Sequence, residues 1–461
     1  MQKEQLSEER ITLPIGQILL HNPHLLHFSS STFTGVSPSN FTHKTSLFTF
    51  RAPLGQILRH SKHALLPISI FISKKLNKKY MHLKADVTVV GAGPAGSTTA
   101  RTIAKKGFKV ILVEKDEYPG KTNVCAGGIP KPVFEETGLK SDIIEKEILR
   151  GEYYYPWGKK YLKLNHVSVY RSIFDRALAN KAVDKGAEML TNTLIKDVEV
   201  REEKVFAFFS DGIIESEIIV FADGPNTLAF RKFGIGFKPD ADKTVVSVAC
   251  EVEWKENPSE CFEYYYGYDF SPWGYGWIFP KRDTANVGIG CLYSKLRTNI
   301  MELLNYMLQK HPITSEKLKD RKILSLNSAL IPFAPAAKIY GERMLVVGDA
   351  AGMVDPVNGG GIMQAIHGGK LAGEVCVNAL EAEKFSASFL SKYQNLWKKS
   401  KDYLHIQSQY LLSNIFLYLS KHDKDAYTKM AAFINGGIRG IPDTFRFIYL
   451  NKHKRNKELF L

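Results

Sequence analysis

The chain has 461 residues, of which 44% are apolar, and lysine plus arginine exceed the acids by 15. The apolar share is typical of a globular protein and excludes a disordered one, and no run of about 18 apolar residues predicts a membrane-spanning helix. The basic surplus favours an anionic partner, which is a nucleic acid, a membrane or an acidic protein. The five cysteines lie far apart without a C-x-x-C pair, so we expect free thiols, a reducing compartment and no metal centre.

Residues 1–84 differ in composition from the rest of the chain. They carry eleven basic residues against three acids, and no acid stands between Arg10 and Lys84. An acid-poor segment rich in serine and threonine is typical of a targeting peptide. The alternative is an extension, disordered or upstream of the true start, with Met81 directly before the first strand. We favour the extension, because Met81 falls where a domain would begin.

The first folded unit is predicted to begin at residue 85. A β-branched strand over 85–90 leads into the turn Gly91-Ala-Gly93-Pro-Ala-Gly96 and a helix over 97–106, and a second strand, 109–113, ends at Glu114. The first glycine permits a tight turn, the second lets the backbone approach a pyrophosphate, and the third lets helix and strand pack closely. Glu114 can accept hydrogen bonds from a ribose diol, and the helix start offers N–H groups to the phosphates. This segment predicts a Rossmann-like dinucleotide-binding fold.

A second glycine-rich segment lies far downstream. A buried strand over 344–347 is followed by Asp349, and Gly359-Gly-Gly361 leads into a helix that begins at Ile362. An aspartate at a strand end can hold the ribityl hydroxyls of a flavin, and the helix start can face the pyrimidine end of its ring. The two segments, about 250 residues apart, predict one FAD-binding domain built from discontinuous chain.

The sequence between these segments is strand-like and aromatic. From 245 to 292, short alternating runs with Gly and Pro between them predict an antiparallel sheet. Tyr275, Trp277 and Phe279 alternate, so their rings share one face and favour a long apolar substrate cavity. An ordinary aromatic core is the alternative. A second aromatic run, 153–157, is another candidate for the cavity wall, but its position does not follow from the sequence.

The C-terminal part is predicted to be helical, with an apolar stripe at three- and four-residue spacing and lysines beside it. The stripe consists of Leu396, Tyr403, Leu404, Tyr410, Leu411, Ile415 and Tyr418, and the basic residues are Lys398, Lys399, Lys401 and the tail 452–455. We favour a helix that covers the core with a basic outer face. The alternative is a peripheral contact with anionic lipid.

Several motifs carry a resemblance that covers the chain from residue 84 to the C-terminus. They are 91–96 with Glu114, 124–129 (VCAGGI), 170–179 (YRSIFDRALA), 222–224 (ADG), 275–281 (YGWIFPK) and 348–362. Together they resemble the geranylgeranyl reductase family, within the FAD flavoproteins of the p-hydroxybenzoate hydroxylase fold, and most of all its archaeal members. The cysteine block of those members typically reads Cys-Ala-Glu-Gly, whereas this chain has Cys125-Ala-Gly-Gly128.

The resemblance implies which residues contact FAD. They are Ala95, Glu114, Cys125, Ala126, Gly128, Arg171, Ile195, Asp349, Gly361 and Ile362, and the glycine turn itself adds Gly91, Gly93 and Gly96 as expected cofactor contacts. Arg171 begins a predicted helix and offers a forked donor to a phosphate or a flavin oxygen, with a surface arginine as the alternative. Ile195, in a predicted short strand, would contribute backbone on the adenine side.

The resemblance also places Cys125 against the isoalloxazine. We expect its thiol to be catalytic and to help protonate the alkene carbon that receives no hydride. The alternative is steric: a small side chain is needed where the backbone meets the ring.

The resemblance, together with the two FAD segments and the aromatic sheet, implies an FAD-dependent reductase that saturates carbon–carbon double bonds of geranylgeranyl chains, on archaeal-type membrane glycerophospholipids. Its expected partners are a prenylated lipid, an electron donor (ferredoxin, NAD(P)H or a deazaflavin) and the membrane surface, without nucleic acid. Its expected place is the cytoplasm, peripheral on the inner face of the membrane. An FAD-dependent monooxygenase and a non-catalytic lipid-binding flavoprotein are the alternatives.

The expected fold class is α/β, with a Rossmann-like FAD-binding domain, an antiparallel substrate domain and a C-terminal helical region. The expected boundaries are 1–84 for the extension, 85–240 and 336–380 for the two parts of the FAD-binding domain, 241–335 for the substrate domain and 381–461 for the helical region.

Overall fold

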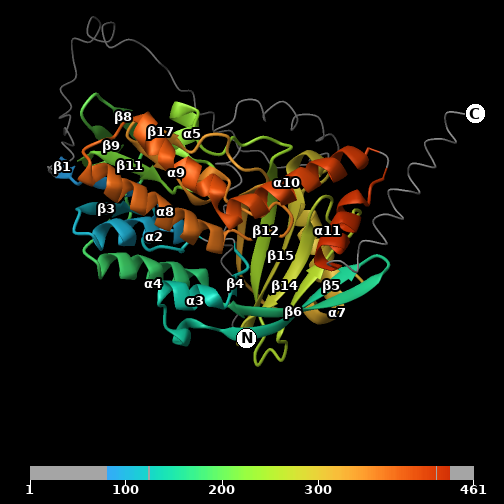
Figure 1. Cartoon of the computed structure of the whole chain (residues 1–461). Coiled ribbons are helices and arrows are strands. Elements are labelled where there is room, and N and C mark those ends of the chain that lie inside the picture. Colours follow the sequence, from blue (N-terminus) through green and yellow to red (C-terminus); the bar gives the residue numbers. More distant parts are fainter. Residues whose placement is uncertain (1–79, 123–124, 422, 437–461) are drawn as a thin grey trace, which may run out of the picture. The chain divides into compact units, whose positions relative to one another are not determined.

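Three β-sheets and the helices packed on them make up the part of the chain that the computed structural model describes (Figure 1). The described residues are 80–122, 125–421 and 423–436, and they belong to the unit Tyr80–Leu461. The two hypotheses for residues 1–79 lie outside the described residues.

The six-stranded sheet holds the predicted dinucleotide-binding fold. Its strand order is β17-β18-β11-β2-β3-β7, and all pairs but β17–β18 are parallel. The bounds are β2 Val87–Val90, β3 Val110–Val113, β7 Glu188–Leu190, β11 Ile218–Phe221, β17 Tyr340–Gly341 and β18 Met344–Val346. The central strands read VTVV, VILV and IIVF, and they are almost wholly apolar because parallel strands are buried on both faces. Since β18 pairs with β11, which in turn pairs with β2, the structure confirms a domain built from discontinuous chain.

Helix α2 packs on this sheet, and two further helices pack beside α2. Helix α2 (Pro94–Ala104) lies between α4 (Arg171–Val183) and α8 (Ile362–Glu381), as Figure 1 shows. It starts three residues before the predicted position, because Pro94 suits the first turn of a helix, where no N–H is required. Small residues allow the close contact with α8: a Cβ on Gly369 would lie 2.5 Å from the carbonyl oxygen of Ala95.

A four-stranded sheet corrects the predicted start of the fold. Its order is β1-β10-β9-β8, and β1 (Met81–Lys84) pairs in parallel with β10 (Gly212–Ser216). Residues 81–84 are thus part of the domain and not of the extension. The strand reads MHLK with only Leu83 turned partly inward, so it lacks the apolar alternation that predicts a strand. The other two strands are β8 Asp197–Val200 and β9 Val205–Phe209.

The eight-stranded sheet contains the predicted antiparallel region and extends beyond it. Its order is β16-β12-β15-β14-β13-β5-β6-β4. The bounds are β4 Gly128–Pro130, β5 Lys146–Tyr155, β6 Gly158–Ser168, β12 Thr244–Glu253, β13 Cys261–Tyr265, β14 Tyr275–Pro280, β15 Thr284–Leu292 and β16 Ile323–Pro332. The pairs β12–β15, β12–β16, β13–β14 and β14–β15 are all antiparallel, as predicted. However, β4, β5 and β6 also join this sheet, although the sequence analysis assigns them to the FAD-binding part, and β5 pairs in parallel with β13.

The C-terminal part is helical as far as the structure describes it. The helices are α9 Ala387–Lys399, α10 Lys401–Leu419 and α11 Ala426–Gly436, and Ser386 and Ser400 cap the first two through their hydroxyl oxygens. Other helices of the described chain are α3 Pro132–Thr137, α5 Leu228–Phe233, α6 Ile300–Gln309 and α7 Thr314–Leu318. Among the described residues, none of the helices is long and apolar enough to span a membrane.

The favoured interpretation of the C-terminal apolar stripe is wrong. Five of its seven members have largely exposed side chains: Leu396, Leu404, Leu411, Ile415 and Tyr418. Helix α10 packs inward through other residues, among them Ile406 and Phe416. Because α10 is apolar on two opposite sides, the spacing of its apolar residues does not reveal which side faces the core.

Candidate active site

The glycine turn between β2 and α2 leaves room for a pyrophosphate. Gly91 has a φ of +99°, and a Cβ there would lie 2.3 Å from the carbonyl oxygen of Ala222. A Cβ on Gly96 would lie 1.9 Å from the carbonyl oxygen of Gly91, so both positions require glycine. A Cβ on Gly93 would meet nothing within 4 Å, and Gly93 is the N-cap of α2, without a side-chain cap or an acid in the first turn. The open space therefore adjoins unpaired helix N–H groups and fits an anionic pyrophosphate.

Glu114 follows β3 and is buried beside this turn. Its carboxylate accepts hydrogen bonds from the backbone N–H groups of Ala92 and Asp116, both at 3.0 Å. Burial raises the pKa of the carboxyl, and the two backbone bonds oppose that rise. Each carboxylate oxygen keeps a lone pair after these bonds. The acid is thus held where it can accept the hydroxyls of a ribose.

Ile195 lies in the loop between β7 and β8, so its predicted position in a short strand is wrong. The residues just before it donate backbone N–H groups to the chain after β3: Asn192 to Asp116 and Thr193 to Glu114, each at 2.9 Å. These bonds hold the loop beside Glu114 without a strand ladder. The Ile195 side chain is buried in the core of the FAD-binding domain.

Asp349 and the start of α8 lie next to the glycine turn. A Cβ on Gly348 would lie 2.9 Å from the Cβ of Ala95, so the two segments of the FAD-binding domain touch. Burial raises the pKa of the Asp349 carboxyl, and Arg171 opposes that rise. Gly361 is the N-cap of α8, without a side-chain cap, and Ile362 is its first residue. The N–H groups at this helix start are available to a flavin ring.

Asp355, which the sequence analysis missed, holds the loop before α8. Its Oδ1 accepts the backbone N–H groups of Val357 at 2.8 Å and Asn358 at 3.2 Å. Its Oδ2 pairs at 2.7 Å with Nε2 of His405 on α10, and this bond raises the pKa of His405. The glycine loop is therefore tied to the C-terminal helices. An aspartate that precedes Pro and Gly is typical of a side chain that bonds its own turn, and this signal predicts the loop but not its partner on α10.

Arg171, the first residue of α4, lies in a buried polar cluster. Its Nε and Nη2 donate to the two carboxylate oxygens of Asp175 at 2.7 and 2.8 Å. Burial would lower the pKa of the guanidinium, but Asp175 and the hydrogen-bonded Cys125 thiol raise it well above its ordinary value. The alternative of a surface arginine is wrong, since the Arg171 side chain is only 13% exposed. The spacing of Asp175, four residues further along the helix, is the signal by which this ion pair could have been found.

The cysteine block departs from the family pattern for a reason that the backbone shows. Gly127 stands where archaeal members typically have glutamate, and it has a φ of +79°. A Cβ there would lie 2.1 Å from the carbonyl oxygen of Val169. The loop of Cys125 and Ala126 therefore has no space for a side chain at Gly127. The next residue, Gly128, lies against the ring of Phe279, which a Cβ would meet at 2.7 Å.

The predicted aromatic trio shares one face of β14, but its members differ in what they contact. Tyr275 and Trp277, with ring centroids 6.0 Å apart, border a cavity. Phe279 instead stacks on Phe262 at 3.9 Å. The Tyr275 hydroxyl donates to the carbonyl oxygen of Asn358 in the glycine loop. Burial raises the pKa of the Tyr275 phenol, and nearby Cys125 contributes to that rise, so the cysteine loop lies close to the cavity at this residue.

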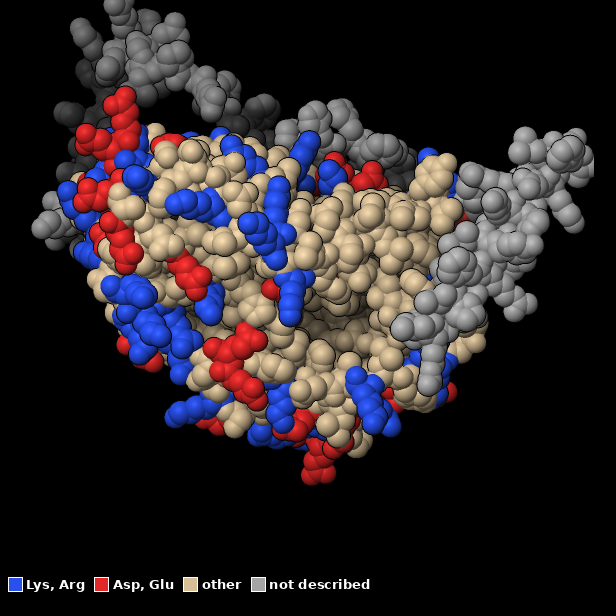
Figure 2. Space-filling model, in the orientation of Figure 1, with Lys and Arg blue, Asp and Glu red and all other residues tan. Residues whose placement is uncertain are grey.

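The cavity wall combines the sheet, the glycine loop and α11. It consists of Val245, Trp273, Gly274, Tyr275, Trp277, Gly290, Ile331, Pro332, Phe333, Asp355, Pro356, Val357, Gly359 and Tyr427. The cavity has a volume of about 40 Å³, room for a few water molecules, so a prenyl chain requires the rings to move apart. Figure 2 shows a hollow among uncharged residues on the face seen in Figure 1.

A buried polar network that the sequence analysis missed holds Trp277. The indole Nε1 donates to the side-chain oxygen of Asn286 at 2.8 Å, and the Asn286 amide donates to Glu251 at 3.1 Å. Lys281 donates to both Glu251 oxygens at 2.9 and 3.0 Å, and the Thr284 hydroxyl donates to the same carboxylate. Polar residues that alternate with apolar ones in buried strands are the signal for such a network, but the pairing partners appear only in the folded sheet.

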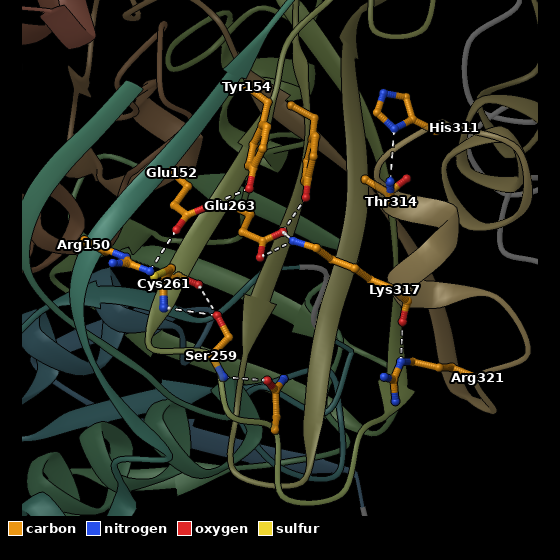
Figure 3. Close-up of polar contacts among 12 residues, drawn as sticks. Arg150, Glu152, Tyr154, Ser259, Cys261, Glu263, His311, Thr314, Lys317 and Arg321 are labelled. Atoms are coloured by element: carbon orange, nitrogen blue, oxygen red, sulfur yellow. Dashed lines mark hydrogen bonds and ion pairs between the residues drawn. The ribbon is translucent and has the colours of Figure 1, made fainter. Parts of the chain in front are cut away.

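The aromatic run 153–157 divides between the two faces of the eight-stranded sheet. Tyr153 stacks on Tyr264 at 4.6 Å, and it packs with Tyr155 in the cluster that includes residues of the cavity wall. Tyr154 points to the opposite face, where it donates to Glu152 at 2.7 Å near the ion pair of Lys317 and Glu263 (Figure 3). Tyr153 and Tyr155 are therefore on the side of the sheet that faces the cavity, whereas Tyr154 is not.

The geometry suits a dinucleotide whose ring end lies beside an apolar substrate. Fold and site thus define an FAD-dependent oxidoreductase, and the comparisons with known proteins narrow this class. The family model of the geranylgeranyl reductase catalytic domain matches residues 240–331, and that of the Thi4 family matches residues 70–220.

A digeranylgeranylglycerophospholipid reductase of Methanocaldococcus jannaschii is 32% identical over 391 residues, which cover 81% of this chain and 95% of the relative. Digeranylgeranylglycerophospholipid reductase 2 of Methanothermobacter thermautotrophicus is 34% identical over 333 residues, 69% of this chain and 84% of the relative. A geranylgeranyl bacteriochlorophyll reductase-like protein of Thermoplasma acidophilum shares the fold, with a TM-score of 0.71 and 24% identity over 82% of this chain and 100% of that one. The chain belongs to the geranylgeranyl reductase family, as its motifs predict.

Proposed function

We propose that this protein saturates carbon–carbon double bonds in the geranylgeranyl chains of archaeal-type membrane glycerophospholipids. The observation that carries the proposal is the place where an apolar cavity meets the FAD site. Tyr275 lines the cavity, bonds the glycine loop before α8 and neighbours Cys125. The names of the two archaeal relatives support the same substrate class.

The residues of the chain provide the surroundings that this reaction needs. FAD bound there, once reduced by the donor, would supply the hydride. The rings of Tyr275 and Trp277 exclude water and hold an apolar chain through burial and dispersion. Arg171, itself held by Asp175, is hydrogen-bonded to the Cys125 thiol, which donates a proton, directly or through water, to the alkene carbon that receives no hydride.

The electrons come from an external donor, which is a reduced ferredoxin, NAD(P)H or a reduced deazaflavin. The surplus of 15 positive charges suits an acidic protein donor. Because the substrate is a membrane lipid, the protein works as a peripheral protein on the inner face of the membrane. Mixing the holoenzyme with each donor under anaerobic conditions identifies the donor by the loss of flavin absorbance.

The direct test is a single turnover of chemically reduced holoenzyme with a digeranylgeranylglycerol phospholipid dispersed in detergent. We expect the lipid to gain two hydrogens for each double bond reduced, as measured by mass spectrometry under anaerobic conditions. Oxygen consumption with incorporation of oxygen into the lipid would instead show a monooxygenase. An unchanged lipid beside a flavin that stays reduced would contradict the reductase and support a binding protein.

Variants of Cys125 test the proton donor. Cys125→Ser and Cys125→Ala should keep FAD and its rate of reduction by dithionite, yet lose alkene reduction in a single turnover. Cys250→Ala is the matched control, because Cys250 likewise forms no disulfide but lies in the core beside α6. If Cys125→Ala reduces the lipid as fast as the parent, the role of Cys125 is steric.

A further inference from the structure

The outer face of α10 is an apolar stripe that is largely exposed in the part of the chain that the structure describes. Its members stand at positions i, i+7, i+11 and i+14, which fall on one side of an α-helix. They are Leu404, Leu411, Ile415 and Tyr418, with exposed fractions of 58, 61, 50 and 55%. From 403 to 420 the helix carries no Lys, Arg, Asp or Glu. We name these four residues the outer stripe.

The opposite side of α10 is buried, and its C-terminal half packs beside the wall of the cavity. Ile406, Ser413 and Phe416 are its buried residues, and Phe416 packs in one cluster with Trp273 and Tyr427, which line the cavity. A surface helix of a soluble protein ordinarily has charged or polar residues opposite its buried side. One helix therefore separates the cavity from the outer stripe, and it is apolar on both sides.

Basic side chains flank the outer stripe at both ends of the helix. They are Lys398, Lys399 and Lys401 before it and Lys421 after it, and all four are exposed. The acids nearest to them in sequence are engaged, since Asp402 pairs with His367 at 2.7 Å and Asp423 with Lys429 at 2.6 Å. In Figure 2 the hollow lies in a broad uncharged area, with Lys, Arg, Asp and Glu side chains at its margins. An apolar stripe between cationic ends complements an anionic lipid surface.

We propose that the outer stripe of α10 docks on an anionic bilayer, with the helix lying in the interface. The inference rests on the proposed function, because that function places the substrate in a membrane. The stripe runs from residue 404 to residue 418, about 21 Å of helix, which suits a helix that lies along the surface. Docking would bring the cavity side of α10 within one helix diameter, about 10 Å, of the acyl region. A prenyl chain could then enter from the bilayer without crossing water.

The test is co-sedimentation of holoenzyme with vesicles of phosphatidylcholine containing phosphatidylglycerol. The parent should bind these vesicles, bind pure phosphatidylcholine vesicles at least tenfold more weakly, and lose affinity as salt is raised. Leu404→Gln/Leu411→Gln/Ile415→Gln should weaken binding to the anionic vesicles at least tenfold. The variant should keep its FAD and its activity on detergent-dispersed lipid, because these side chains lie outside the site.

A matched control changes equally exposed apolar residues elsewhere. Leu149→Gln/Ile323→Gln/Leu324→Gln removes side chains that are 59, 48 and 48% exposed on β5 and β16, and it should bind vesicles like the parent. Failure of the parent to bind, or equal loss in both triple variants, would overturn the proposal. The proposal would also be overturned if the stripe instead holds two copies of the chain together. In that case the parent would be a dimer that does not bind vesicles, and the α10 variant would be a monomer. Failure of the proposed function would give a different result: the parent would still bind vesicles but would not reduce the detergent-dispersed lipid.

Discussion

The buried ion pair behind Trp277 offers the sharpest test of the energetics of the site. Lys281→Met removes a cation whose side chain is 3% exposed and which donates to both oxygens of Glu251. The carboxylate, 13% exposed, keeps two neutral donors, Thr284 and Asn286. Breaking a buried pair on one side costs about 3–5 kcal/mol. Because these two hydrogen bonds remain, we expect the lower end, a loss of about 3 kcal/mol in the free energy of unfolding.

A double-mutant cycle separates the pair from its surroundings. Glu251→Gln alone leaves Lys281 buried without an anion and should also cost about 3 kcal/mol. In Lys281→Met/Glu251→Gln no charge remains, and the amide can still accept from Thr284, so the loss should fall to about 1 kcal/mol. Urea unfolding of the holoenzyme, followed by flavin release and far-ultraviolet circular dichroism, measures all three. The reasoning would be refuted if the double variant lost as much unfolding free energy as the two single variants together, because the two charges would then not interact.

Four further outcomes are expected. Glu114→Arg should abolish FAD binding, measured by flavin absorbance after gel filtration, because it replaces the acceptor beside the glycine turn with a cation. Gly127→Glu, which restores the usual residue of the family, should lose soluble holoprotein, since its Cβ would lie 2.1 Å from a carbonyl oxygen. The pKa of His367 is raised to about 9 by its bond to Asp402 and by Glu136. The protonated imidazole therefore adds stability that is complete below pH 6.5 and is lost as the pH rises through 9, about 1–2 kcal/mol after allowance for exposure. His367→Gln should flatten this pH dependence of the free energy of unfolding, measured by urea unfolding at several pH values. A chain that begins at Met81 should bind FAD like the parent, because β1 starts there, and loss of holoprotein would contradict this.

Local sequence was enough to predict the dinucleotide site. The glycine turn, α2 and Glu114 lie within about 25 residues of one another, and steric limits on glycine together with the spacing of strand and helix leave few alternatives. The same holds for the shared face of Tyr275, Trp277 and Phe279, because side chains of a strand alternate strictly. Family motifs then supplied residues that spacing alone does not indicate, among them Cys125 and Arg171.

The rest was decided by contacts between segments that are distant in sequence. The partner of Lys281 is Glu251 on another strand. Strand β1 pairs with β10 and strand β5 pairs with β13, and in both pairs the two strands are more than 100 residues apart in sequence. A single sequence shows that a segment can pair, but not with which edge, because pairing depends on the backbone groups that the rest of the fold leaves open. In α10 the apolar residues were evident from the sequence, but only the packed structure shows which side the cavity wall buries and which side remains exposed.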